Sequence, residues 1–196
     1  MVMKKRLIVV LVLLTNAPWT VGARGANEPV DFRGMKWGIS PEEADRLILE
    51  QWDKRRQAGE LILSTDRNVR HLDDRSKQLG YRDKIGTVFA RIELQFLDDK
   101  FLGVILSFEP EHFNQIDSAF KARYGKPSLE DKVPLKNSFG ATYINQRRVW
   151  QFSDVTITLG KYIDARTAGG RIAKRALDRY DEAQSKRKKD EAAKGL

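Results

Sequence analysis

The sequence contains no cysteine and only two histidines. The lack of cysteine excludes disulfide bonds, thiolate zinc sites, a cysteine nucleophile and a lipidated cysteine within this chain. With so few histidines, a transition-metal site would need several carboxylate ligands, and the segment 71–74 is better explained as a polar surface loop. We therefore expect no metal and no cofactor, and a fold held together by its hydrophobic core.

Common catalytic motifs are also missing. The sequence has no Gly-x-Ser-x-Gly elbow, and Gly169-Gly170 is not part of a Walker pattern. Asp98-Asp99 is typical of a turn, and Glu109 and Glu111 suit the start of a helix. No catalytic residue is assigned, although carboxylates distant in sequence can still meet in space.

Long hydrophobic runs are absent except for a short one at the N-terminus. Lys4-Lys5-Arg6 precedes the apolar run 7–14, and Val21-Gly22-Ala23 has the small residues of a signal-peptidase site. The run is shorter than the ~20 residues that a membrane-spanning helix needs. These features predict a signal peptide over 1–23, cleavage after Ala23 and a periplasmic or secreted protein without a membrane span. An uncleaved N-terminal anchor is the alternative.

The strongest structural signal is a β-hairpin over 86–108. Apolar residues alternate with polar ones in its first arm, at Val88, Ala90, Ile92, Leu94 and Phe96, and again in its second, at Leu102, Val104, Leu106 and Phe108. A loop of Asp98-Asp99-Lys100 places both apolar sets on one face, with Phe96 opposite Leu102. A two-residue loop would pair Phe96 with Phe101 and turn the second set outward.

Before this hairpin the pattern predicts a short strand at 32–37 and a helix. Ser40, Pro41 and Glu43 form a capping box, and Gly59 ends the helix. The helix buries a stripe of residues: Ala44, Leu47, Ile48, Gln51 and Trp52. Residues 61–63 are expected to form a strand, and the charged stretch 64–83 a long loop.

After the hairpin the pattern predicts a second helix, over 109–124, and a polar link over 126–140. The helix carries the stripe Phe113, Ile116, Phe120 and Tyr124, and Gly125 caps it. A meander is expected at 141–160, with turns at 145–148 and 153–154 and with Tyr143, Trp150 and Ile157 in one cross-strand row. A loop at 164–170 then leads to a C-terminal helix over 171–194 that packs through Ile172, Ala176, Leu177 and Tyr180.

These elements predict an α+β fold. We expect an antiparallel sheet, made of the hairpin 86–108 and the meander 141–160, with two helices packed on one face and a C-terminal helix. The order helix–sheet, helix–sheet suggests a tandem repeat. The expected organisation is a signal peptide at 1–23, one α+β domain at 24–170, and a C-terminal helix with a basic tail at 171–196.

The charge is concentrated at the C-terminal end. The formal net charge is +9, of which the signal peptide contributes three positive residues. A compact cluster, Lys186, Arg187, Lys188 and Lys189, lies in a segment without an apolar stripe, where we expect a solvated, fraying helix. Such a cluster is a candidate site for polyanions or anionic lipid surfaces. Nucleic acid is the less favoured partner, and a merely solvated tail is the simplest alternative.

Three stretches resemble a group of small exported bacterial proteins, most of them uncharacterised. They are Gly34-Met-Lys-Trp-Gly-Ile-Ser-Pro-Glu-Glu-Ala44, Arg123-Tyr-Gly-Lys-Pro127 and Val149-Trp-Gln-Phe-Ser-Asp-Val-Thr-Ile-Thr-Leu159. The helix-plus-sheet units of that group resemble the fold of the outer-membrane assembly lipoprotein and the β-lactamase inhibitor protein. The resemblance covers roughly residues 32–160 and rests on short capping and strand-edge motifs of a generic kind. It transfers no catalytic residue.

We therefore expect an exported, non-enzymatic binding or scaffold protein of the bacterial envelope. Its partner would be an envelope protein or an anionic polymer or lipid surface, contacted through residues 186–189. The alternative is a carboxylate-based hydrolase that acts on an envelope polymer. A buried acid in a cleft would favour the hydrolase, and an exposed apolar sheet face would favour the binding protein.

Overall fold

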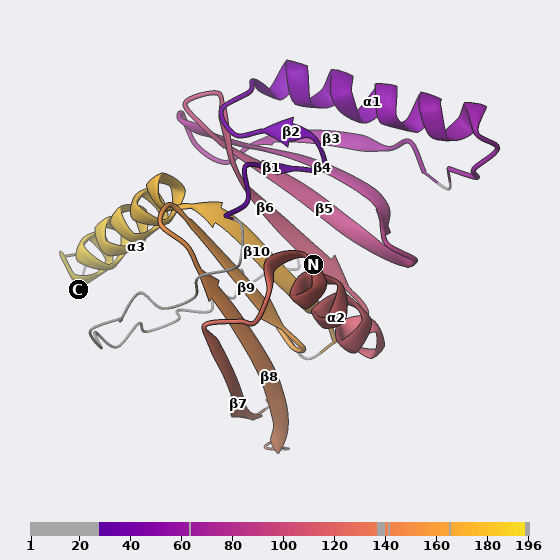
Figure 1. Ribbon diagram of the computed structural model, residues 1–196. Coiled ribbons are helices and arrows are strands. Elements are labelled where there is room, and N and C mark those ends of the chain that lie inside the picture. The colour runs from indigo at the N-terminus through magenta and orange to yellow at the C-terminus, as the bar shows by residue number, and fades with distance from the viewer. Residues whose placement is uncertain (1–27, 63, 137–139, 141, 165, 195–196) are drawn as a thin grey trace, which may run out of the picture.

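The computed structural model describes residues 28–62, 64–136, 140, 142–164 and 166–194. The predicted signal peptide and its cleavage site lie outside this range. The described residues form an eight-stranded antiparallel sheet, a two-stranded hairpin and three α-helices (Figure 1). The predicted α+β class is confirmed. No helix in the described part of the chain is both long enough and apolar enough to cross a membrane.

The chain is built as two similar halves that meet in the middle of the sheet. The first half contains α1 (Pro41–Gln57), β3 (Arg67–His71), β4 (Ser76–Ile85), β5 (Val88–Leu97) and β6 (Lys100–Phe108). The second contains the 3₁₀ turn η1 (Pro110–His112), α2 (Phe113–Tyr124), β7 (Leu129–Lys136), β8 (Thr142–Gln151), β9 (Val155–Gly160) and β10 (Ala168–Lys174). The strand order is β3-β4-β5-β6-β10-β9-β8-β7, so the last strand of each half lies at the centre. This order matches the expected tandem helix–sheet repeat.

Both α1 and α2 pack on one face of the sheet, as expected. Trp52 of α1 meets Tyr81 of β4 edge-on, with ring centroids 6.1 Å apart. Phe120 of α2 meets Trp150 of β8 in the same way at 6.0 Å. All four side chains belong to one hydrophobic core. We call the opposite side of the sheet the open face.

The start of α1 shows one half of the predicted capping box, while the Glu43 carboxylate accepts a hydrogen bond from Arg46. Ser40 Oγ accepts a hydrogen bond from the backbone N–H of Glu43, and Pro41 occupies the first turn. The preceding segment 32–37 is not one strand, as predicted, but a tight hairpin of β1 (Asp31–Phe32) and β2 (Met35–Lys36). It turns at Arg33 and Gly34, whose φ angles of 55° and 81° bring the two short strands together.

The central hairpin forms, but its predicted loop was wrong. Asp98 and Asp99 both have positive φ, which is the backbone of a two-residue type I′ turn, and Phe96 does pair with Phe101. A β-bulge then places Leu94 opposite Val104. The extra residue in β6 restores the buried face that a two-residue loop alone would have inverted.

Two stretches predicted as connections are strands. The long loop expected at 64–83 contains β3 and most of β4, and the polar link expected at 126–140 contains β7. Conversely, residues 61 and 62, expected in a strand, belong to no strand, while residue 63 is outside the described range. Of the three misassigned strands, β3 and β7 are the edges of the sheet, where side chains are half-exposed or exposed and the apolar alternation is weak. The third, β4, lies inside the sheet but buries the polar residues Ser76, Gln78 and Asp83, which hide its pattern.

The C-terminal meander is longer than predicted. Residues 145–148 form the middle of β8 rather than a turn, and Tyr143 pairs with Leu135 of β7. The predicted pairing of Trp150 with Ile157 is confirmed.

The last helix, α3 (Arg175–Lys194), begins later than predicted because residues 171–174 belong to β10. Ile172 is therefore buried as a strand residue, and Ala176 is exposed rather than packed. Beyond Ala183 the chain remains helical to Lys194.

Candidate binding surface

The predicted basic cluster lies on the distal half of α3. The side chains of Lys186, Arg187, Lys188 and Lys189 are all exposed. Successive helical residues are about 100° apart, so four consecutive cations surround the helix axis instead of sharing one face. Among the described residues, one ion pair involves the cluster, between Arg187 and Glu191 at 3.7 Å. The cluster is accessible from several directions but forms no pocket.

The proximal half of α3 is firmly attached to the open face. Leu177 packs against Leu97 and Ala173 in a small hydrophobic cluster. Gly103 lies beneath it, since a Cβ there would come within 2.5 Å of Leu177 Cδ2. On β10, Arg171 forms ion pairs with acidic residues of the first turns of α3. The helix is thus anchored at its first turns and carries the cations 186–189 toward its other end.

A further contact ties α3 to the turn between β3 and β4. The Tyr180 hydroxyl donates a hydrogen bond to Asp73 Oδ2 across 3.0 Å, and the Arg75 guanidinium lies 5.3 Å from the Tyr180 ring centre. Burial raises the pKa of Asp73, but hydrogen bonds from Ser76, from Tyr180 and from backbone N–H groups outweigh it and lower the pKa to about 2. Asp73, considered above as a metal ligand, therefore acts as a turn and helix anchor.

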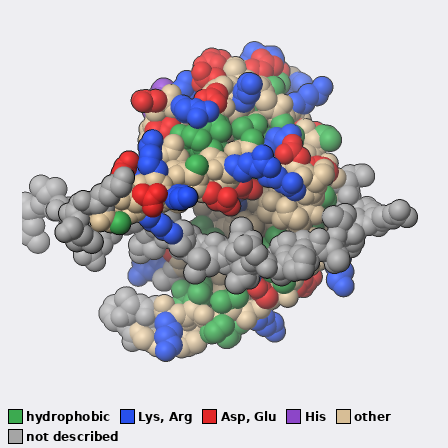
Figure 2. All heavy atoms as spheres, turned by 90° about the vertical axis from the view of Figure 1, so that its left-hand side faces the viewer, with side chains coloured by type: hydrophobic (Ala, Val, Ile, Leu, Met, Phe, Trp, Pro, Cys, Tyr) green, Lys and Arg blue, Asp and Glu red, His purple; other side chains and the backbone are tan. Residues whose placement is uncertain are grey.

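The described surface that is visible on the side of the molecule where α3 lies shows no continuous basic patch (Figure 2). In Figure 2, Lys and Arg side chains are interspersed with Asp and Glu over the described surface. The 186–189 cluster therefore stands out by its density on one short helical segment and not as part of a larger basic field.

The open face carries arginines on adjacent strands. Arg82 of β4 pairs directly with Arg91 of β5, and Arg91 pairs with Ser107 of β6. The Glu93 carboxylate accepts hydrogen bonds from Arg91 at 2.9 Å and from Arg70 at 2.8 Å. Two arginines, Arg70 and Arg91, thus share one carboxylate in this half of the face.

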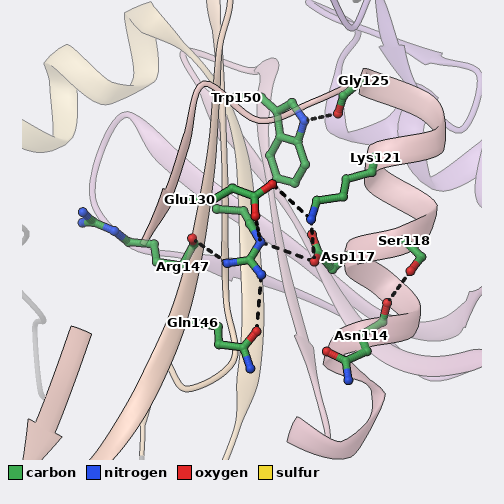
Figure 3. Close-up of polar contacts among 10 residues, drawn as sticks. Asn114, Asp117, Ser118, Lys121, Gly125, Glu130, Gln146, Arg147 and Trp150 are labelled. Atoms are coloured by element: carbon green, nitrogen blue, oxygen red, sulfur yellow. Dashed lines mark hydrogen bonds and ion pairs between the residues drawn. The ribbon is translucent and has the colours of Figure 1, made fainter. Parts of the chain in front are cut away.

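A buried charged cluster lies beneath α2 and is drawn in Figure 3. Arg148 of β8 is 9% exposed and Asp117 of α2 is 7% exposed, and Arg148 Nε lies 3.3 Å from Asp117 Oδ2. Lys121 Nζ lies 3.2 Å from Asp117 and 3.1 Å from Glu130 of β7. Two acids and two bases balance one another, so this network joins the helix to the sheet.

A second buried acid lies under α1. Asp83 of β4 contacts Arg33 at 2.9 Å and Arg55 at 2.6 Å. Burial raises the pKa of Asp83, but the bonds from Arg55 and the charge of Arg33 outweigh it, and the pKa is lowered overall. A carboxyl held ionised in this way is suited to tethering α1 and the β1–β2 hairpin, and not to donating a proton.

A cavity of about 420 Å³ lies where the segment after α1 passes strands β4, β5 and β6. Its lining includes apolar Leu61, Phe89 and Phe108 and basic Arg55, Arg82 and Arg91. Two acids also line it, Asp83 and Glu109, the first of which is neutralised by the two arginines described above. The volume falls in the range of small-molecule sites, about 300–1,000 Å³.

These sites bear directly on the two expected functions. In the described part of the chain, no group of three or more His, Asp or Glu residues is arranged to hold a metal ion. The buried carboxylates Asp83 and Asp117 are each paired with arginine. The pKa of Asp83 is lowered, so this carboxyl is not suited to act as a general acid.

The sequence predicted one of these features and missed three. The cluster 186–189 is visible as a run of cations, whereas the Asp83 site, the Asp117–Arg148 network and the cavity assemble residues from separate elements. One usable signal is the alternation around Arg82. If Tyr81 and Asp83 are taken as buried and Arg82 as exposed, residues 81–83 show the period-two pattern of a strand.

Comparisons with known proteins found no matching family model, no matching curated protein and no matching solved structure. The resemblance to the envelope lipoprotein and inhibitor fold therefore stays a prediction.

Proposed function

We propose that this chain is an exported, non-enzymatic binding protein of the bacterial envelope that contacts a polyanionic partner through Lys186, Arg187, Lys188 and Lys189. The observation that carries the proposal is the division of α3 into an anchored half and an exposed cationic half. The anchored proximal half keeps the four charges at one end of the molecule, where each adds up to ~1 kcal/mol near an anionic surface.

The arrangement favours an extended anionic surface over a small anion. Because the four cations surround the helix axis, a small anion would contact only one or two of them, whereas a polymer or lipid surface can engage several. Such binding weakens steeply with salt, since the Debye length falls from ~10 Å at 0.1 M to ~3 Å at 1 M.

The test compares three forms of the chain lacking residues 1–23. They are the parent (24–196), a form ending at Ala183, and a form of the same length as the parent in which Lys186, Arg187, Lys188 and Lys189 are all replaced by Gln. Binding to heparin and to vesicles containing phosphatidylglycerol is measured at low and high salt. We expect both altered forms to lose most of the salt-sensitive binding.

A matched control removes the same charge elsewhere. Lys54, Lys126, Lys132 and Lys136 are exposed on other elements, and replacing all four by Gln changes the net charge equally. Parent-like binding by this control, with loss in the cluster variant, supports the proposal. Equal binding by all forms means that the cluster only solvates the helix.

A further inference from the structure

Two arginines lie directly opposite each other on the open face of the sheet. Arg82 of β4 and Arg91 of β5 are cross-strand partners, and both side chains are exposed. Side chains alternate along a strand, so the buried residues beside them, Asp83 and Ala90, point to the helix-covered face instead. Like charges on directly opposed residues destabilise a sheet. Glu93 compensates Arg91, but no described residue forms an ion pair with Arg82.

The next cross-strand pair adds a lysine and an uncovered aromatic ring to the same face. Lys84 pairs with Phe89, and its Nζ lies 5.2 Å from the centre of the Phe89 ring. Each residue lies two positions along its strand from one of the two arginines, so all four side chains point to the open side. Phe89 is 48% exposed, so much of its ring meets solvent. We call the four residues Arg82, Lys84, Phe89 and Arg91 the hairpin patch.

The charge around the hairpin patch is one-sided. On the open side of strands β3 to β6, Arg70 adds a further cation, whereas Glu93 is the one acid. Arg70 and Arg91 share that carboxylate, at 2.8 Å and 2.9 Å. Like Arg82, Lys84 forms no ion pair with a described residue. These four strands therefore carry an excess of positive charge beside an apolar ring.

The helix α3 leaves the hairpin patch uncovered. Its hydrophobic anchor on the open face is Leu97, which ends β5, whereas Phe89 lies near the start of that strand. This separation along β5 is roughly 26 Å at the ~3.3 Å rise of each strand residue. A ligand can therefore reach the hairpin patch without displacing α3.

We propose that the hairpin patch binds an anionic glycan, a chain of sugar rings that carry carboxylate groups. The carboxylates are held by Arg82 and Arg91, whose planar guanidinium groups suit two-pronged bonds to such oxygens. The apolar C–H face of a sugar ring covers Phe89, which removes apolar surface of both partners from water. This site is separate from the cluster on α3, and the inference does not depend on that cluster.

The aromatic ring is the reason to prefer a glycan over other anions. A polyanion without an apolar face leaves Phe89 in water and gains nothing from it. Insertion into a lipid bilayer strengthens with the apolar area that is buried. On the open side of β3 to β6, Phe89 is the one large apolar side chain that is exposed, which matches a single sugar ring better than a bilayer.

The test uses the chain lacking residues 1–23 with residues 186–189 replaced by Gln, so that binding at α3 does not contribute. Calorimetry compares tetragalacturonate, which has sugar rings and carboxylates, with uncharged maltotetraose and with tripolyphosphate, which has no rings. We expect saturable binding of tetragalacturonate and much weaker binding of the other two. Replacing Arg82 and Arg91 together by Gln should weaken tetragalacturonate binding about tenfold. Phe89→Ser should weaken it several-fold and leave tripolyphosphate binding unchanged.

The matched control replaces Lys132 and Lys136 of the edge strand β7 by Gln, which removes the same charge and should leave the affinity unchanged. The Arg82/Arg91 variant should melt no lower than its background form, because it relieves the opposed like charges. Equal affinity of these two forms for tetragalacturonate would overturn the proposal. So would tripolyphosphate binding as tight as that of tetragalacturonate, or an unchanged affinity in Phe89→Ser, because either result leaves the ring without a role.

A last arm measures vesicles containing phosphatidylglycerol. Vesicle binding that requires Phe89, in the absence of tetragalacturonate binding, would also overturn the proposal and assign the hairpin patch to a membrane surface. Loss of the patch in these experiments leaves the proposed role of 186–189 untouched, since that cluster is tested by its own variants.

Discussion

Trp150 donates its indole N–H to the backbone carbonyl of Gly125 across 2.8 Å, and this bond joins β8 to the end of α2. Trp150 is 1% exposed, and its ring also packs against Phe120. Gly125 ends the helix with a φ of 76°. One side chain therefore fills the core of the second half and satisfies a carbonyl that the helix leaves free.

Trp150→Ala should lower the free energy of unfolding by roughly 3–5 kcal/mol, as other large-to-small core changes do. Trp150→Phe retains most of the ring but loses the hydrogen bond to Gly125, and should cost less. Trp37→Ala is the comparison, because Trp37 is only half-buried and stacks on Phe101 at 4.9 Å. Urea unfolding measures all three. Equal, small losses of unfolding free energy for Trp150→Ala and Trp37→Ala would contradict the assignment of Trp150 to the buried core.

The network under α2 should behave as a coupled buried ion pair. Asp117→Ala or Arg148→Ala alone leaves the other buried charge with one partner fewer and should cost up to about 3–5 kcal/mol. Asp117→Leu combined with Arg148→Met removes both charges and should cost much less than the sum of the single changes. A double-mutant cycle by urea denaturation gives the coupling. Additive losses would show that the two charges act independently.

The pH dependence of stability should report on Asp83. Its pKa is lower in the folded chain than in the unfolded chain, so it stabilises the fold above the unfolded-state value of ~3.9. That stabilisation is lost as the pH falls from there through the folded-state pKa. Asp83→Asn should therefore be destabilising at pH 7, and the gap to the parent should narrow toward pH 3. Asp53→Asn, on the exposed side of α1, is the control, and a gap that stays constant with pH would contradict the assignment.

Glycines in the sheet should differ sharply in their tolerance of a side chain. A Cβ on Gly169 would come within 2.6 Å of the backbone oxygen of Leu106, so Gly169→Ala should cost about 1–3 kcal/mol. A Cβ on Gly80 would meet nothing closer than 3.8 Å, so Gly80→Ala should be neutral or slightly stabilising. Thermal melts measure both variants. Similar changes in melting temperature for Gly169→Ala and Gly80→Ala would contradict the close packing between β6 and β10.

The length of α3 makes a separate prediction about stability. Residues 184–194 continue the helix, but the side chains of its last turns are mainly exposed and carry no apolar stripe. Ending the chain at Ala183 should therefore change the melting temperature by little, since a helix without a packed face is marginal in water. A drop of many degrees would mean that this half of the helix is docked.

Local signals predicted the elements whose stabilising contacts lie within one sequence window. The Ser40 cap of α1, the stripe of α2 and the Trp150–Ile157 pairing all belong to this class. The two-residue turn at Asp98 and Asp99 was missed because the prediction required the apolar residues of both arms to share one face in a regular hairpin. The β-bulge next to the turn meets that requirement in another way. Lys100 resists the left-handed position of a three-residue loop, and that local preference was the better guide.

Long-range charge pairing explains the other misses. Residues 145–148 were assigned to a turn because Arg147 and Arg148 interrupt the apolar pattern. Arg148 is nevertheless buried in β8, since Asp117 and Glu130 come from two other elements to pair with it. Asp83 likewise enters the core only with arginines from the β1–β2 hairpin and from α1. No pattern within a single strand reveals such partners.

The meeting of the two halves at β6 and β10 also fixes the order in which the chain can finish folding. Gly103 faces Ala173, and Ile105 faces Arg171, so β6 gains its second neighbour only when nearly the whole chain is present. Until then Val104 and Leu106 lie on a bare strand edge, the kind of surface that recruits other chains. Pairing across such a large sequence separation is slow. A nascent or C-terminally shortened chain that lacks 168–174 should therefore associate through β6, so the final strand acts as the protein's protection against its own aggregation.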